Sequence, residues 1–62
     1  MNKYEIEIWF RYGQFEKDFE IVEIEADTES EAFLIAKDLR HWVFSVKLLS
    51  TNGIALEKDG KS

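Results

Sequence analysis

The chain has 62 residues, of which 34% are charged and 15% aromatic, and its formal net charge is −5. A domain of this size buries only about 60% of its unfolded surface, which leaves little room for both a core and an enclosed catalytic pocket. The absence of cysteine excludes disulfides, thiolate nucleophiles and cysteine zinc sites. The surplus of acids disfavours generic nucleic-acid binding, which depends on Lys and Arg. We expect a non-enzymatic protein without a cofactor.

The first predicted element is a strand over residues 4–12, where large apolar side chains at even positions alternate with mostly polar odd positions. A period of two over this length is typical of a strand with one buried face. Trp9, at an odd position, is expected on the outer face. The pair Gly13-Gln14 then suits a two-residue type II′ hairpin turn.

The second predicted strand, over about residues 15–26, contains a register conflict. A two-residue turn places Phe15 and Phe19 on the apolar side of the hairpin. The same register, continued, would turn Val22 and the apolar residues after it outward. One extra residue reverses the facing of everything that follows it, so we predict a β-bulge near residues 20–21.

This bulged register places seven carboxylates on the outer face of the hairpin. So dense an acidic patch repels itself and favours contact with a basic surface. Alternate residues of a strand lie about 6.6 Å apart, close to the phosphate spacing of a DNA strand, which suggests nucleic-acid mimicry. The alternative is that the acids only keep the protein soluble. With Trp9 as the expected anchor, the predicted partner-binding residues are Trp9, Glu5, Glu7, Glu16, Asp18, Glu20, Glu23 and Glu25.

A helix is expected to begin after Thr28, because Thr28 as N-cap and Glu31 three residues later form a capping box. Capping explains this acidic segment better than a calcium loop, which needs a central Gly and fixed ligand offsets. His41 is expected in solvent near the helix end, since no nucleophile or orienting partner accompanies it. One apolar stripe should cover the sheet, formed by Ala32, Ile35, Ala36, Leu39 and Val43.

A third strand is expected over residues 43–49, which are rich in β-branched and aromatic side chains. The pair Asn52-Gly53 is typical of a type I′ hairpin turn, which predicts a short fourth strand over residues 54–56. Residues 59–62 have the composition of a disordered tail.

Together these elements predict one α+β domain over residues 1–58, with the order ββαβ and a short extra strand. The expected sheet is antiparallel, its strand order is 2-1-3-4, and one helix covers one face. No segment approaches the ~20 apolar residues of a membrane span. The charged start of the chain does not resemble a signal peptide, so we expect a cytoplasmic protein.

The run IEADTESEA (24–32), entered from a hairpin that begins KYEIEI (3–8), resembles the opening of many short phage and mobile-element proteins, including the DpnD/PcfM-like group. The resemblance covers about residues 3–40 and consists of hairpin and capping chemistry. It implies a phage or mobile-element accessory protein, for example one that counters host defence. It carries over no functional residue.

Three functions stay open from the sequence. The first is an acidic interaction module that docks on a basic protein surface, in its most specific form an inhibitor of a nucleic-acid-binding protein by DNA mimicry. The second is a homo-oligomeric structural accessory protein that buries its open sheet face against its own copy. The third is a single-stranded RNA binder that stacks bases on Trp9, which the surrounding acids disfavour.

Overall fold

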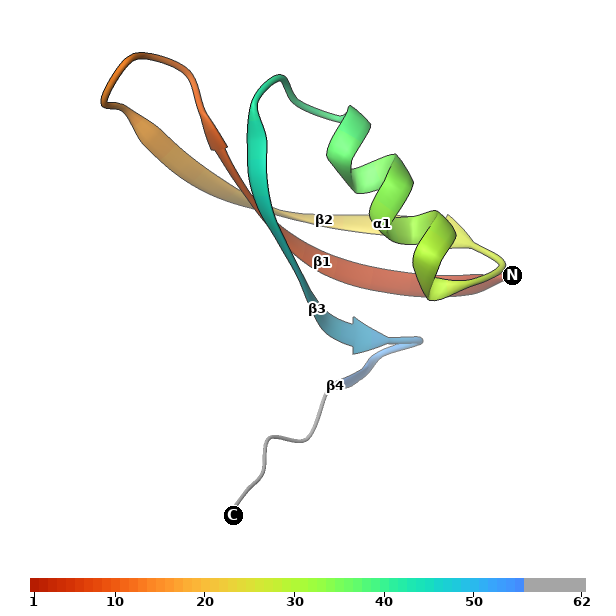
Figure 1. The fold of residues 1–62 in the computed structure, drawn as a ribbon. Helices are drawn as coiled ribbons and strands as arrows, with labels where there is room; N and C mark the ends of the chain where they lie inside the picture. Colours follow the sequence, from red (N-terminus) through yellow and green to blue (C-terminus); the bar gives the residue numbers. More distant parts are fainter. Residues whose placement is uncertain (56–62) are drawn as a thin grey trace.

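The computed structural model describes residues 1–55. Its elements follow the order β1 (Asn2–Arg11), β2 (Lys17–Ala26), α1 (Glu29–Asp38), β3 (Val43–Thr51) and β4 (Ile54–Ala55). The strands form one antiparallel sheet in the order β2-β1-β3-β4, and α1 lies across one face of it (Figure 1). The α+β fold and the strand order predicted from the sequence are confirmed. The predicted tail and Leu56 lie outside the described residues.

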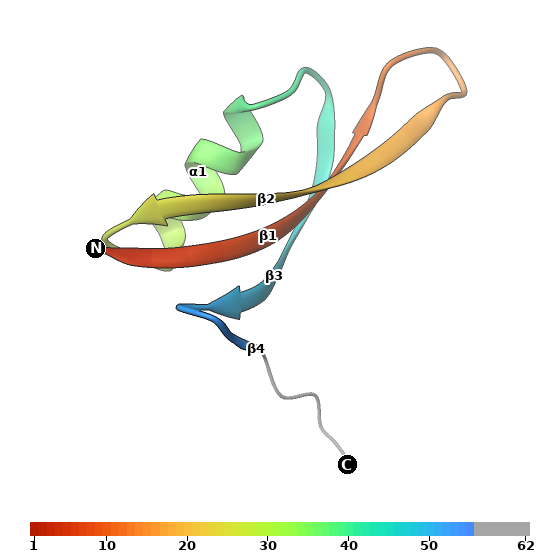
Figure 2. The ribbon, with the colours of Figure 1, turned by 180° about the vertical axis from the view of Figure 1, so that it is seen from behind.

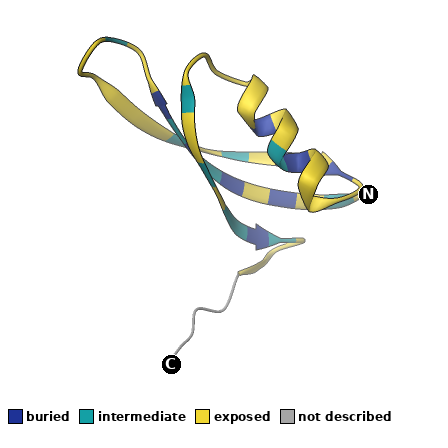
Figure 3. Cartoon of the chain, in the orientation of Figure 1, coloured by how far each residue is buried: buried dark blue, intermediate teal, exposed yellow. Residues whose placement is uncertain are grey.

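The hydrophobic core lies between α1 and the central strand β1. Even positions of β1 point to the helix, as the alternation in the sequence predicts. Figure 3 shows the buried residues gathered in the part of the sheet under α1, whereas the far end of the β1–β2 hairpin is mostly exposed. The buried apolar residues are Tyr4, Ile6, Ile8, Phe10, Ile24, Ala26, Ala32 and Ala36.

The helix begins at the predicted capping box. Thr28 has extended backbone angles, and its Oγ1 accepts a hydrogen bond from the Glu31 amide at 3.2 Å. The Glu31 carboxylate accepts in turn from the Asp27 amide at 3.1 Å. The first bond satisfies an amide that the first turn of a helix leaves without a partner, and the second holds the residue before the N-cap against the start of the helix.

The apolar stripe of α1 is narrower than predicted. Ala32 and Ala36 are fully buried, but Ile35 and Leu39 are 42% and 50% exposed. The helix stops at Asp38, and Phe33 instead packs against the core. Two alanines let the helix backbone approach the sheet closely, so the larger side chains on either side extend past the contact.

The predicted bulge in the β1–β2 hairpin is wrong. The two strands pair without a register shift from Arg11 opposite Lys17 to Asn2 opposite Ala26. The extra residue sits in the connecting loop, where the Tyr12 amide donates to the Glu16 carbonyl at 3.3 Å and three residues form the turn instead of two. A longer turn sets the later register from the start, so no bulge is needed.

That change of turn length moves two aromatic residues. Phe15 lies in the turn and is 85% exposed, and Phe19 lies on the face opposite to α1 and is 47% exposed. The sequence-based expectation that both are buried is therefore wrong. Seen from behind in Figure 2, this face of the sheet has none of the described elements packed over it.

Strand β3 carries two register shifts against β1, and its extra residues are Phe44 and Leu49. The β3–β4 turn has Asn52 at φ +53° and Gly53 at φ +83°, the two positive angles of the predicted type I′ turn. Asn52 also binds the first strand. Its side-chain Oδ1 accepts a hydrogen bond from the Lys3 backbone amide at 2.8 Å, and its backbone amide donates to the Lys3 carbonyl at 2.6 Å.

Candidate interaction surface

The side of the sheet away from α1 is here called the open face. Odd positions of β1 and β2 point to it, because side chains alternate along a strand and the even positions face the helix. Five of the eight residues predicted to bind a partner share this face, and the structure brings them together. These are Glu5, Glu7, Trp9, Glu23 and Glu25.

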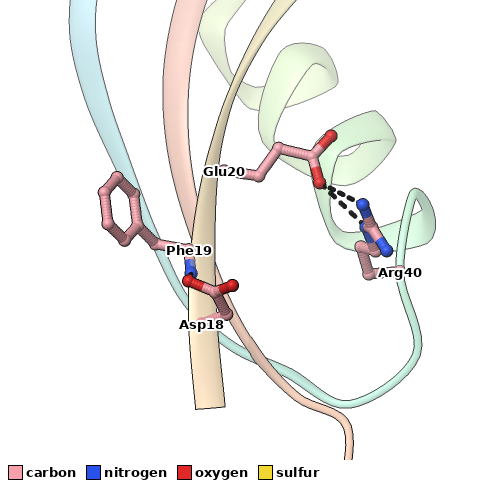
Figure 4. Close-up of polar contacts among 4 residues, drawn as sticks. All are labelled: Asp18, Phe19, Glu20 and Arg40. Carbon is pink, nitrogen blue, oxygen red and sulfur yellow. Dashed lines mark hydrogen bonds and ion pairs between the residues drawn. The ribbon is translucent and has the colours of Figure 1, made fainter.

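The other three predicted residues do not belong to the open face. Glu20 points toward the helix and binds Arg40, with 2.9 Å between its Oε1 and Arg40 Nε. Figure 4 shows Phe19 and Glu20 leaving β2 on opposite sides. Asp18 is at an even position like Glu20, and its Oδ1 accepts from the Phe19 amide at 2.8 Å. Glu16 lies in the hairpin turn.

The sequence placed these three acids wrongly because the inserted bulge kept Glu16, Asp18 and Glu20 outward. In an uninterrupted ladder, every residue of β2 before the proposed bulge changes face. The prediction that seven carboxylates form one patch is therefore wrong, and the four that remain on the open face are Glu5, Glu7, Glu23 and Glu25.

The centre of the open face is aromatic and apolar. Trp9 lies directly opposite Phe19, and their rings are stacked with centroids 5.0 Å apart at an interplanar angle of 30°. Ile21, the next outward residue of β2, is 51% exposed. The Trp9 indole N–H donates to the Glu7 carboxylate at 3.2 Å, which fixes the ring orientation. The prediction from the sequence did not include Phe19 and Ile21, because only the length of the turn decides which face of the sheet they point to.

The aromatic region continues toward the hairpin turn through Arg11. Its guanidinium carbon lies 5.6 Å from the ring centre of Trp42 and 6.0 Å from that of Phe44. The Arg11 amide donates to the Trp42 carbonyl at 3.1 Å, and Trp42 has a φ of +62°. Arg11 is thus a cation held among exposed rings, a favourable cation–π arrangement.

The charges of the open face are sorted along the strands. Near the hairpin turn, Arg11 lies opposite Lys17, and beyond the apolar centre Glu5 lies opposite Glu23. Between them, Glu7 lies opposite Lys47 of β3. At the far end of the face, Lys3 lies opposite Glu25. The face is therefore basic beside the turn, apolar in the middle, acidic at Glu5 and Glu23, and of mixed charge at the far end, in contrast to the uniform acidity predicted from the sequence.

A hollow of about 350 Å³ lies between the end of β1 and the α1–β3 connection. His41 is one of its lining residues, together with Phe10, Arg11, Tyr12, Leu39 and Arg40. The lining has no carboxylate to orient the imidazole and no thiol or aliphatic hydroxyl to serve as a nucleophile. Within residues 1–55 no three His, Asp or Glu side chains gather as a metal site. The absence of enzymatic activity stays a prediction.

Comparison with protein-family models, with curated proteins and with solved structures finds no match. In the part of the chain that the structure describes, no helix has the length and apolar character needed to cross a bilayer.

Proposed function

We propose that the chain is a protein-interaction module whose open face docks on another protein, with the stacked pair of Trp9 and Phe19 as its anchor. The observation that carries the proposal is this stacked pair, in which Trp9 is partly buried and Phe19 is about half exposed, beside Ile21 at the centre of a helix-free sheet face. Aromatic side chains in the middle of a patch, with polar residues around them, are typical of the energetically dominant part of an interface.

The number of large apolar side chains in so short a chain supports the proposal. A domain of about 60 residues is marginally stable, so apolar side chains are needed in its core. This chain nevertheless leaves Phe19, Ile21 and Phe44 about half exposed. A partner that covered them would recover their burial. Its complementary surface needs an apolar patch with basic groups placed against Glu5 and Glu23.

DNA mimicry stays a prediction that this geometry does not favour. A mimic needs a continuous row of anions, but the open face carries four cations as well as four acids. RNA binding has the rings it needs for base stacking, but Glu5, Glu7 and Glu23 would repel phosphates over half of the face. A protein surface satisfies both the apolar centre and the mixed charges.

Site-specific photo-crosslinking in living cells tests the proposal. A benzophenone amino acid at Ile21 reports contact at the open face, and the same group at Leu34, which is 64% exposed on the helix, is the matched control. We expect adducts from position 21 and few from position 34, and we expect Trp9→Ala to remove the former. A far-UV circular dichroism spectrum confirms that the Trp9→Ala variant is folded.

Equal adduct yields from the two positions, or yields at position 21 that do not depend on Trp9, would contradict the proposal. Adducts that a nuclease shortens would favour the RNA hypothesis in its place.

A further inference from the structure

Two cross-strand pairs of the open face carry like charges. Arg11 is directly opposite Lys17, and Glu5 is directly opposite Glu23. Like charges at directly opposed positions of an antiparallel pair are destabilising. Within residues 1–55 none of the four forms an ion pair with an oppositely charged side chain. The isolated chain therefore keeps two repulsive pairs of opposite sign on one surface.

The two pairs are placed symmetrically about the apolar centre. Along β1, positions 5 and 11 are equally far from position 8, and along β2, positions 17 and 23 are equally far from position 20. Trp9 and Phe19 lie on one side of this midline. Ile21 and Glu7 lie on the other. A half-turn about an axis along the midline therefore exchanges the position of the basic pair with that of the acidic pair.

We propose that the partner of the open face is a second copy of this chain, packed face to face about that two-fold axis. This inference rests on the proposed function and names its partner. In this arrangement β1 crosses over β1 and β2 over β2 with their directions reversed. Lys17 meets Glu23 of the second copy, and Arg11 meets Glu5 of the second copy. Phe19 packs against Ile21 of the second copy.

The arrangement agrees with general rules of sheet packing. Two sheets pack about 10 Å apart with their strands within about 30° of alignment. The two helices stay on the outside, so each sheet is covered on both faces. Glu7 and Lys47 lie side by side near the midline with opposite charges, so the centre of the interface carries no net charge. Each like-charge pair gains the counter-charges that its own chain lacks.

The association is measured by sedimentation from about 1 µM to about 1 mM chain, the range in which weak interfaces form. We expect a reversible dimer that weakens as salt is raised, because the charged ends lie at the rim of the interface. Lys17→Glu and Glu23→Lys should each weaken it by on the order of tenfold, since each reverses two symmetry-related contacts. The double variant should recover most of the loss, because the two new charges again meet each other.

Three controls distinguish a loss of these contacts from a general charge effect and from a loss of folding. Glu23→Lys lowers the net negative charge of the chain. If general charge repulsion between copies controlled association, this variant would therefore associate more tightly than the wild type, whereas we expect it to associate more weakly. Lys37→Glu, on the exposed side of α1, makes the same charge change as Lys17→Glu away from the interface and should have little effect. Each single swap also removes one like-charge pair within the chain, so urea unfolding should show no loss of stability.

A chain that stays monomeric at about 1 mM would overturn the inference, and so would a double variant that associates no better than the single variants. The crosslinking experiment distinguishes a failure of the dimer proposal from a failure of the proposed function. Trp9-dependent adducts at position 21 much heavier than two 7.3 kDa chains would retain the docking face and exclude the second copy as its partner.

Discussion

Arg40, just beyond the C-terminal end of α1, binds Glu20 in the middle of β2 through both Nε and Nη2, while its guanidinium carbon lies 4.6 Å from the ring centre of Phe10. One side chain therefore connects the end of the helix to the two longest strands. The two charged side chains are 47% and 37% exposed, so water screens much of their attraction.

Arg40→Ala is expected to lower the free energy of unfolding by about 1 kcal/mol, and Glu20→Ala by less than about 0.5 kcal/mol. Arg40 loses both the ion pair and the contact with Phe10, whereas Glu20 loses only the ion pair. Urea unfolding of the two variants and the wild type, at low and at high salt, measures both losses of stability. The Glu20→Ala effect should shrink in salt, and equal losses for the two variants would show that the ring contact contributes nothing.

Thr28→Ala is expected to destabilise the protein by about 1 kcal/mol, because it removes the acceptor of the Glu31 amide at the start of α1. Thr28→Ser keeps a hydroxyl at the same position and is the control, with little change expected. Urea unfolding followed by circular dichroism gives both values. A Ser variant as unstable as the Ala variant would rule out capping as the cause.

Ile8→Ala is expected to cost about 2–5 kcal/mol, because Ile8 is fully buried and its truncation leaves a cavity under the helix. Ile21→Ala is the matched control. It makes the same truncation in the same sheet, but on a side chain that is 51% exposed, and in the dilute monomer it should cost less than about 1 kcal/mol. Thermal unfolding of the two variants should differ widely. Similar melting temperatures would be incompatible with the uninterrupted register.

Asn52→Ala is expected to destabilise the protein by about 1–3 kcal/mol, because it combines a strained positive φ with the loss of the side-chain bond to Lys3. Asn52→Gly accepts the positive φ but lacks the side chain, so its free energy of unfolding should lie between those of the wild type and the Ala variant. Hydrogen exchange of the Lys3 amide supplies the local readout. It should become faster in both variants.

The parts of the fold that the sequence predicted correctly have local causes. The capping box joins residues three positions apart, and the Asn52-Gly53 turn depends on two adjacent residues that tolerate positive φ. The alternation along β1 fixes which of its residues are buried. Each of these patterns is complete within a few residues, so no knowledge of the rest of the chain was needed.

The facing of β2 before Ile21 could not be derived in this way. A turn of two residues followed by a bulge and a turn of three residues without one give the same pairing of Ile6 with Val22. They differ in which way the residues of β2 before the bulge point, Phe19 and Glu20 among them. In the regular ladder that the structure shows, Phe19 is about half exposed and Glu20 reaches Arg40. That partner lies twenty residues further along the chain.

Strand β2 is one edge of the sheet, and over its ten residues no other strand among residues 1–55 pairs with its outer side. Such a long, regular edge is a template on which further chains add by backbone hydrogen bonding. Half of its side chains are charged, namely Lys17, Asp18, Glu20, Glu23 and Glu25. Their neutralisation would leave a β-prone apolar segment at the border of the molecule, so these charges also protect the protein against growth into fibrils.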